Sequence, residues 1–403
     1  MRIAVIGGGV TGCSVAWHLA ERGLGDVVLL ERDRIGSGTT WHSAGNITWK
    51  PLEDNDAQVN YMFELIERFE ADGEHTTGWV KTGRLFLART DKGMKQFEPL
   101  AAEAEARGHG SPLIPAAEAA RRHPLLNPDV FHGAWFNEWS GRLNPADLTA
   151  CYARAARAAG AEVREQCGVL GLTVNGGRVR AVDTTQGSID VDAAVICGGL
   201  WSRDLVLPLD VHLAQWGCQH FYVIAAVDVR LPRETPSFAS PGDLVYGREE
   251  VGDFLVGCFD ERALCLEPGQ LPEPFVFTLL EPNWDQFAPY FERAAELFPV
   301  LADAPIKRFV NGPESFSPDG NPLIGPVAEV SGLFACSAMN SRGVTLSGAS
   351  GHIIADMIEG VAPRFDPSSY APDRFGDKVA DLAWLKQEVS ATPSRYYLEA
   401  NRL

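Results

Sequence analysis

The sequence lacks any run of about 18 consecutive apolar residues, and this absence predicts a chain without a transmembrane helix. It is also short of positive charge, with 35 lysines and arginines against 53 aspartates and glutamates and a net charge of -18. This negative charge disfavours nucleic acids and anionic membranes as partners. A strand pattern that begins at Arg2 leaves no space for a targeting segment, so we expect a cytoplasmic protein.

Paired cysteines are missing as well. The chain has eight cysteines but no C-x-x-C pair, so the sequence indicates neither a zinc site nor a dithiol redox motif, and we expect no metal. Several cysteines lie within apolar runs, as Cys197 and Cys336 do, which predicts reduced and buried thiols. The length of 403 residues and a hydrophobic content of 45% are enough for two globular domains.

Residues 1–31 carry the pattern of a dinucleotide-binding unit. An apolar strand over 2–6 runs into a turn with G-x-G-x-x-G spacing, formed by Gly7, Gly9 and Gly12, and a helix over 13–22 follows. The first glycine allows the tight turn, the second lets the backbone approach a pyrophosphate, and the third lets helix and strand pack closely. The pyrophosphate then lies at the helix N-terminus, where free N–H groups favour anions.

The second strand of this unit, over 26–31, ends in the acid Glu31. Its carboxylate is expected to accept hydrogen bonds from a ribose diol and to disfavour the 2′-phosphate of NADP. The stretch over 36–46 is small and hydroxyl-rich, which suits it to wrap a pyrophosphate and a ribityl chain, and it favours FAD over NAD. The predicted cofactor contacts of this region are Gly7, Gly9, Val10, Thr11, Gly12, Glu31, Arg32, Ser37, Thr39, Thr40, Ala44 and Gly45.

With these motifs the chain resembles the large family of amine- and amino-acid-oxidising flavoproteins that includes D-amino acid oxidase and sarcosine oxidase. Within that family, Ser37–Gly45 is similar to the segment of dimethylglycine and sarcosine dehydrogenases whose histidine bonds covalently to the 8α-methyl group of FAD. His42 falls on that position, so the resemblance implies FAD held covalently through His42. The alternative is a histidine that packs near the flavin ring without a bond to it.

The resemblance implies a fold of class α/β plus α+β, with a Rossmann-like FAD-binding domain interleaved with a substrate domain on a mostly antiparallel sheet. The FAD-binding domain is expected over 1–79, 140–204 and 311–365, the substrate domain over 80–139 and 205–310, and a tail over 366–403 that packs on the FAD-binding domain. Residue patterns predict an amphipathic helix over 57–74, one continuous strand over 216–223, paired strands over 244–249 and 253–259, and a helix over 348–359.

The same resemblance implies later contacts to the cofactor. These are Val169, Gly198, Gly199 and Trp201 beside strands, and Gly343, Val344 and Thr345, where a helix N-terminus would face the flavin edge that gains negative charge on reduction. It also places His220 and Tyr246 over the flavin, and Arg248 shares a strand face with Tyr246 and would suit a substrate carboxylate. We therefore predict His220, Tyr246 and Arg248 as catalytic residues. The alternatives are a core histidine, a sheet tyrosine, and a surface ion pair of Arg248 with Glu249 or Glu250.

The implied activity is oxidation of the C–N bond of a secondary or tertiary amine, such as an N-methyl amino acid. A hydride passes to flavin N5, the iminium is hydrolysed, and the electron acceptor is oxygen or an electron-transfer protein. The chain lacks a lysine near Thr345 and a cysteine over 317–325, which monomeric sarcosine oxidases use for carboxylate and FAD. It also ends near where the folate-binding domain of the long dehydrogenases would begin, so formaldehyde should be released.

Three alternatives remain. One is a D-amino acid or opine-type oxidase that produces a keto acid, against which the missing lysine and the match at Trp41 and His42 argue. The second is the flavin-bearing subunit of a hetero-oligomeric dehydrogenase, which would need a partner chain for activity. The third is a binding protein without catalysis.

Overall fold

A computed structural model describes residues 1–51, 53–71, 73, 75–267 and 269–399. Its first layer is a six-stranded sheet in the order β20-β21-β12-β1-β2-β8. Neighbours from β21 to β8 run parallel, and β20 is antiparallel to β21. The bounds are β1 (Arg2–Ile6), β2 (Asp26–Leu30), β8 (Glu162–Arg164), β12 (Ala193–Ile196), β20 (Leu323–Pro326) and β21 (Leu333–Ser337).

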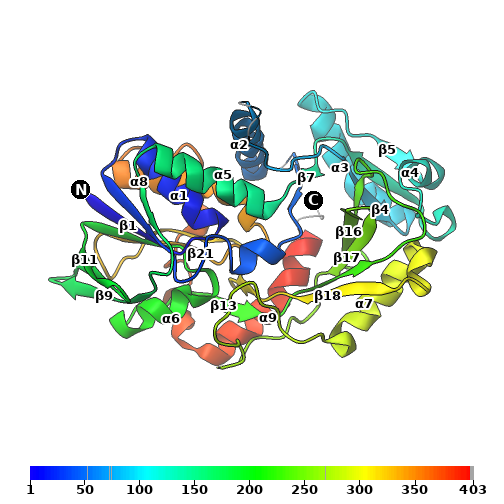
Figure 1. The fold of residues 1–403 in the computed structure, drawn as a ribbon. Helices are drawn as coiled ribbons and strands as arrows, with labels where there is room; N and C mark the ends of the chain where they lie inside the picture. The colour runs from blue at the N-terminus through cyan, green and yellow to red at the C-terminus, as the bar shows by residue number, and fades with distance from the viewer. Residues whose placement is uncertain (52, 72, 74, 268, 400–403) are drawn as a thin grey trace.

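Both faces of this sheet are covered, which explains why its strands are continuous apolar runs. Ile3 and Val5 point to a core shared with helices, whereas Ala4 and Ile6 belong to the core on the other face. The helices are α1 (Val10–Glu21), α2 (Glu53–Glu70), α5 (Pro145–Ala158) and α8 (Gly343–Glu359), which lie together in Figure 1. The opposite face carries the three-stranded sheet of β9 (Val169–Asn175), β10 (Arg178–Thr184) and β11 (Gly187–Asp190).

The second large layer is an eight-stranded sheet in the order β18-β14-β17-β16-β15-β4-β6-β5, on the right in Figure 1. Its strands pair antiparallel except for β4 and β15, which run parallel. The strands are β4 (Arg84–Ala88), β5 (Leu113–Pro115), β6 (Gly133–Asn137), β14 (Phe221–Ala225), β15 (Ser237–Ser240), β16 (Val245–Glu250), β17 (Asp253–Cys258) and β18 (Ile306–Asn311). The helices α3 (Asp91–Ala106), α4 (Ala116–Arg122) and α7 (Trp284–Leu297) accompany this sheet. The predicted fold class is thereby confirmed.

The prediction of one strand over 216–223 is wrong. The chain leaves one sheet and enters another at Gln219 and His220, giving β13 (Trp216–Cys218) and β14. β13 pairs with β19 (Glu314–Phe316), whereas β14 pairs with β17 and β18. An alternating pattern reports which residues are buried but not which neighbour a strand pairs with, so the break is invisible in the sequence.

Two predicted helices have different bounds in the structure. α8 begins at Gly343, five residues before the predicted start at Gly348, so the predicted flavin-facing turn is already helical. The first turn of α8 contains Gly343 and Thr345 and has no long apolar stripe, so the sequence pattern did not predict a helix there. Tertiary packing nevertheless makes this turn helical. α2 spans Glu53–Glu70, and the predicted end at Glu74 lies outside the described residues.

The C-terminal tail contacts more than the predicted FAD-binding domain. Its helix α9 (Leu382–Glu399) packs near β13 and β19, between the two large sheets in Figure 1. The Thr392 hydroxyl donates to the Ser317 carbonyl at 2.9 Å, and the Ser390 hydroxyl donates to the Ala263 carbonyl at 2.8 Å. The tail therefore also touches the predicted substrate domain.

Among the described helices, none has the length and apolar character that crossing a membrane requires.

Candidate active site and cofactor cavity

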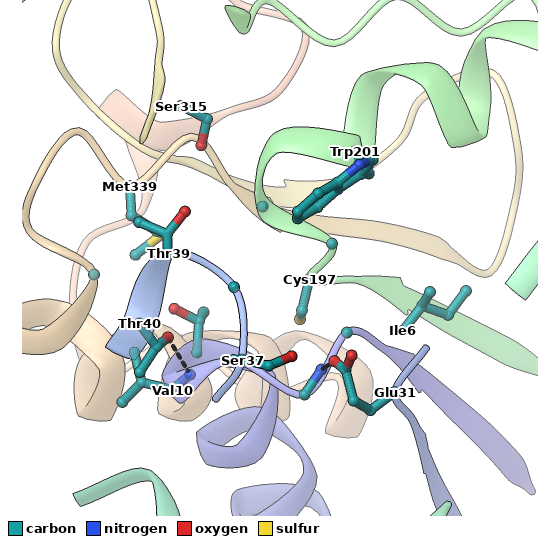
Figure 2. Close-up of a pocket in the computed structure, with 18 of the residues that line it drawn as sticks. Ile6, Val10, Glu31, Ser37, Thr39, Thr40, Cys197, Trp201, Ser315 and Met339 are labelled. Atoms are coloured by element: carbon teal, nitrogen blue, oxygen red, sulfur yellow. Dashed lines mark hydrogen bonds between the residues drawn. The ribbon is translucent and has the colours of Figure 1, made fainter. Parts of the chain in front are cut away.

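The larger cavity has a volume of about 370 Å³ and opens at the end of β1, above the N-terminus of α1. Figure 2 shows Ile6 and Glu31 on one side of it, and Ser315 and Met339 on the other. Fifteen of the predicted cofactor residues line it: Gly7, Gly9, Val10, Thr11, Glu31, Arg32, Ser37, Thr39, Thr40, Val169, Gly198, Gly199, Trp201, Gly343 and Val344. Segments far apart in the sequence therefore meet around one cavity.

The glycine turn has little room for side chains. Gly7 has a φ of +109°, and a Cβ there would lie 2.4 Å from the Cys197 carbonyl oxygen. Gly12 does not line the cavity. It packs against the turn itself, where a Cβ would lie 1.9 Å from the Gly7 carbonyl oxygen. Gly9 caps α1 without a side-chain hydrogen bond, and the Thr40 hydroxyl accepts from the Val10 N–H at 3.1 Å (Figure 2). An open helix N-terminus over a bare backbone fits a pyrophosphate.

Glu31 lines this cavity beside the glycine turn. Its carboxylate accepts hydrogen bonds from the Gly8 N–H at 2.6 Å and the Asp33 N–H at 2.8 Å, which fix its position after β2. Burial raises the pKa of Glu31, and these two hydrogen bonds act in the opposite direction. Arg32 stacks on the Trp201 ring at 4.5 Å. A fixed acid beside a stacked aromatic residue fits the adenosine half of FAD.

A smaller cavity of about 140 Å³ adjoins the first one. The residues that line both cavities mark their junction: Ser43, Glu314, Asn340, Ser341 and Val344. The predicted contacts Ala44, Gly45 and Thr345 line only the smaller cavity. The smaller cavity lies between the start of α8 and the eight-stranded sheet, because Val344 and Thr345 line it together with Arg84, Phe86 and Tyr246.

His220 and Tyr246, both predicted catalytic residues, line the smaller cavity. Their rings are nearly parallel, at 10°, and the Tyr246 hydroxyl lies 3.4 Å from His220 Nε2. Burial lowers the pKa of His220, so its imidazole is neutral at pH 7. Burial and then Glu314 raise the pKa of Tyr246 well above its usual value, so its hydroxyl keeps its proton. The pair offers one proton acceptor and one donor to a ligand.

Arg248, the third predicted catalytic residue, lines neither cavity. Its Nε donates to the Ala44 carbonyl at 2.7 Å, and its Nη1 lies 2.5 Å from Glu250 Oε2. Its guanidinium is thus bound by Glu250 and by the carbonyl of Ala44, a residue that lines the smaller cavity. Arg248 therefore acts as a support for the segment that follows His42.

Sequence reasoning missed three cations in the smaller cavity: Lys50, Arg84 and Arg342. Burial, followed by the nearby Arg84 and Arg342, lowers the pKa of Lys50 to about 7. Arg84 donates to the Thr48 hydroxyl at 2.7 Å, and Arg342 donates to the Gly320 carbonyl at 2.6 Å. These residues are far apart in the chain and belong to no local motif, so only the fold brings them together.

His42 is buried in the short helical turn over 39–42 and lines neither cavity. Its ring packs on Gly312, where a Cβ would lie 2.3 Å from His42 Nδ1. Its Nε2 is buried and has no hydrogen-bond partner among the described residues. Burial, and then His220, lower the pKa of His42 to about 3, so the ring is neutral. A neutral imidazole with an unoccupied nitrogen has the chemistry of a nucleophile.

Known proteins resemble the chain over nearly its whole length. The model of the FAD dependent oxidoreductase family matches residues 2–357. Mitochondrial sarcosine dehydrogenase of Mus musculus is 33% identical over 405 residues, which cover 98% of this chain and 44% of the relative. The 4-methylaminobutanoate oxidase (formaldehyde-forming) of Paenarthrobacter nicotinovorans is 30% identical and is matched over 98% of this chain and 48% of its own length. The chain thus spans about half the length of these relatives.

Solved structures show the same fold. L-proline dehydrogenase from P. horikoshii superposes with a TM-score of 0.81 at 24% sequence identity, over 93% of this chain and 97% of the other.

Proposed function

The chain belongs to the FAD dependent oxidoreductase family, and we propose that it oxidises the C–N bond of a secondary or tertiary amine that carries a carboxylate. N-methyl amino acids are the substrate class that we favour. The observation that carries this proposal is the smaller cavity, which joins the cofactor cavity and combines an aromatic pair, His220 and Tyr246, with three cations.

The cations support a carboxylate in the substrate. Lys50, Arg84 and Arg342 line the smaller cavity and do not line the cofactor cavity. A guanidinium and an ammonium group donate charge-assisted hydrogen bonds to carboxylates, and these are about twice as strong as neutral ones. The substrate carboxylate would bind at Lys50 and Arg84, and its amine would face the junction and the cofactor.

Bound FAD supplies the two-electron acceptor, and the side chains supply the remaining functions. The neutral His220 imidazole can take the proton of a bound ammonium group, because a nitrogen that is to form a C=N bond needs its lone pair. Tyr246, which stays protonated, can donate a hydrogen bond and hold the amine in place. The buried walls of the cavity also disfavour the charged form of the amine.

His42 would hold the FAD covalently. The neutral ring, the buried Nε2 without a partner and the similarity to sarcosine dehydrogenase support this part of the proposal. The residues that would hold the noncovalent contacts are those that line the larger cavity, with Glu31 at the ribose and Gly343 at the N-terminus of α8.

An anaerobic bleaching screen tests the proposal. Purified holoprotein is mixed with sarcosine, dimethylglycine, 4-methylaminobutanoate and D-amino acids, and the flavin absorbance is followed. We expect bleaching by an N-methyl amino acid and release of formaldehyde after admission of air or an artificial acceptor. We expect formaldehyde because the similar 4-methylaminobutanoate oxidase is formaldehyde-forming.

Three other results would contradict the proposal. Bleaching by D-amino acids with a keto acid as product would indicate the D-amino acid oxidase alternative. Ammonia without formaldehyde would indicate deamination of a primary amine. Yellow protein that no amine bleaches, but that becomes active with a partner chain, would indicate a subunit of a larger dehydrogenase.

A further inference from the structure

We propose that Glu314 is a catalytic residue that binds the substrate nitrogen and stabilises the positive charge on it during oxidation. This inference rests on the proposed amine oxidation and identifies the group that faces the nitrogen. Glu314 is buried at the junction of the two cavities and lines both of them. It is the one carboxylate among the described residues that line the smaller cavity.

The position of Glu314 is determined by two elements. It begins β19, where it lies opposite Cys218 of β13, and β13 leads directly to His220. On its other side, the Ser341 hydroxyl donates a hydrogen bond to the Glu314 carboxylate. Asn340 and Ser341 have φ values of 51° and 58°, in the left-handed region that non-glycine residues seldom adopt. This unusual backbone turns the Ser341 hydroxyl toward Glu314.

The acidic and basic side chains of the smaller cavity differ in whether they also line the cofactor cavity. Glu314 lies at the junction with the cofactor cavity, whereas Lys50 and Arg84 line only the smaller cavity. A zwitterionic amino acid binds such a cavity in one orientation, with its carboxylate at the cations and its nitrogen at Glu314. This orientation directs the amine toward the flavin side.

The charge of Glu314 affects the pKa values of Tyr246 and His220. It contributes to the raised pKa of Tyr246, after burial, and it opposes the lowering of the pKa of His220 by burial. Glu314 therefore faces the same space as the proposed proton acceptor and donor. A cation between these three groups would be held by the carboxylate.

The chemistry needs a negative charge at this point. The substrate ammonium first gives one proton to His220 and becomes a neutral amine. The carbon–hydrogen bond next to the nitrogen then breaks, and its hydrogen and two electrons pass to the FAD of the proposed function. The nitrogen lone pair forms the C=N bond, so a positive charge appears on the nitrogen, and water later adds to the carbon. A fixed carboxylate stabilises the transition state in which this charge develops.

The variant Glu314→Gln tests the role directly. Glutamine keeps the size of the side chain and can still accept the hydrogen bond from Ser341, but it has no charge. We expect the limiting rate of anaerobic bleaching by an N-methyl amino acid to fall roughly 100-fold, as when one charge-stabilising group is removed from other enzymes. Binding of acetate, an amine-free carboxylate, should not weaken when it is followed by the shift of the flavin spectrum.

Two further variants make the outcome decisive. Glu314→Asp retains the charge and should recover part of the rate, and the exposed Glu329→Gln should behave as wild type. Equal bleaching rates in wild type and Glu314→Gln would overturn the inference, as would loss of bound FAD from Glu314→Gln. Failure of wild type to bleach with any amine would instead contradict the proposed function, so the two failures are distinguishable.

Discussion

At the scale of single residues, the histidine proposed to bind FAD depends on a glycine far away in the sequence. His42 packs its ring on Gly312, which leaves its Nε2 without a partner among the described residues. Gly312 does not have a positive φ, so alanine is compatible with the backbone there. A methyl group at this position would meet the ring at 2.3 to 2.9 Å, too close for any real contact.

We expect Gly312→Ala to reduce the proposed covalent attachment of FAD, because the added methyl group would displace the His42 ring. The flavin that remains with acid-precipitated protein should fall in this variant and vanish in His42→Ala. Gly242→Ala, where the added methyl group meets open space, is the matched control. Wild-type protein that releases all its yellow colour into the acid supernatant would rule out the covalent bond.

Lys50 gives a second expectation at the residue scale. Its pKa of about 7 means that the side chain is cationic at pH 6 and largely neutral at pH 8. Because a carboxylate favours the cationic form, the affinity for acetate should fall as the pH rises through 7. Lys50→Met should weaken binding at pH 6 by about tenfold, equal to about 1.4 kcal/mol, and abolish the pH dependence.

Flavin difference spectra at several pH values measure this affinity. Lys81→Met is the matched control, since Lys81 lies over Trp139 outside the cavity. A wild-type affinity that is constant between pH 6 and pH 8 would show that Lys50 does not contact the carboxylate.

At the scale of elements, two glycines in the turn from β1 into α1, Gly9 and Gly12, have different roles. Gly12 faces the interior of the turn, where a Cβ would lie 1.9 Å from the Gly7 carbonyl. Gly9 faces the cavity, and a Cβ there meets only the Thr40 hydroxyl, at 3.2 Å. Gly12 is therefore needed for the packing of the turn, whereas Gly9 allows the approach of the cofactor.

Gly12→Ala should therefore lower the free energy of unfolding by about 3 kcal/mol or more, because backbone must move to relieve the overlap. Gly9→Ala should leave the stability nearly unchanged and reduce the FAD content of the purified protein. Urea unfolding and the ratio of flavin to protein absorbance distinguish the two variants. Equal losses of stability in both would contradict the assignment.

At the scale of the whole molecule, stability depends on histidines that the fold buries in their neutral form. His123 lies within the core of the eight-stranded sheet, between Phe254 and Phe298 with ring centroids 5.4 and 5.0 Å away. Neither ring nitrogen has a partner in the part of the chain that the structure describes. Burial lowers the pKa of His123 to about 4.

This shift makes the fold sensitive to acid. The unfolded chain binds a proton at His123 below pH 6.5, whereas the folded chain does so only near pH 4. The free energy of unfolding should therefore fall as the pH drops through this window, by about 2 kcal/mol between pH 7.5 and pH 5 for this group. Urea unfolding of His123→Leu should show a smaller fall than wild type, and the exposed His132→Leu should match wild type. An identical pH dependence in all three proteins would contradict the assignment.

The sequence by itself determined the features that depend on neighbouring residues. The strand, glycine turn, helix and acid over 2–31 form a local unit, so spacing alone predicted the dinucleotide end of the cavity. The paired strands predicted over 244–249 and 253–259 were likewise visible in the sequence, and the structure has them as β16 and β17. His220 and Tyr246 were identified through family resemblance, and the structure brings them together in the smaller cavity.

Only the tertiary structure decided which side chains share a cavity. Lys50, Arg84, Glu314 and Arg342 come from four separate segments, and no local pattern marks residues that only the fold brings together. The same holds for Arg248, whose guanidinium contacts Ala44 and Glu250. Periodicity specifies the face on which a side chain lies, and three-dimensional packing determines what that face meets. The charges that we propose to select the substrate are therefore a property of the fold.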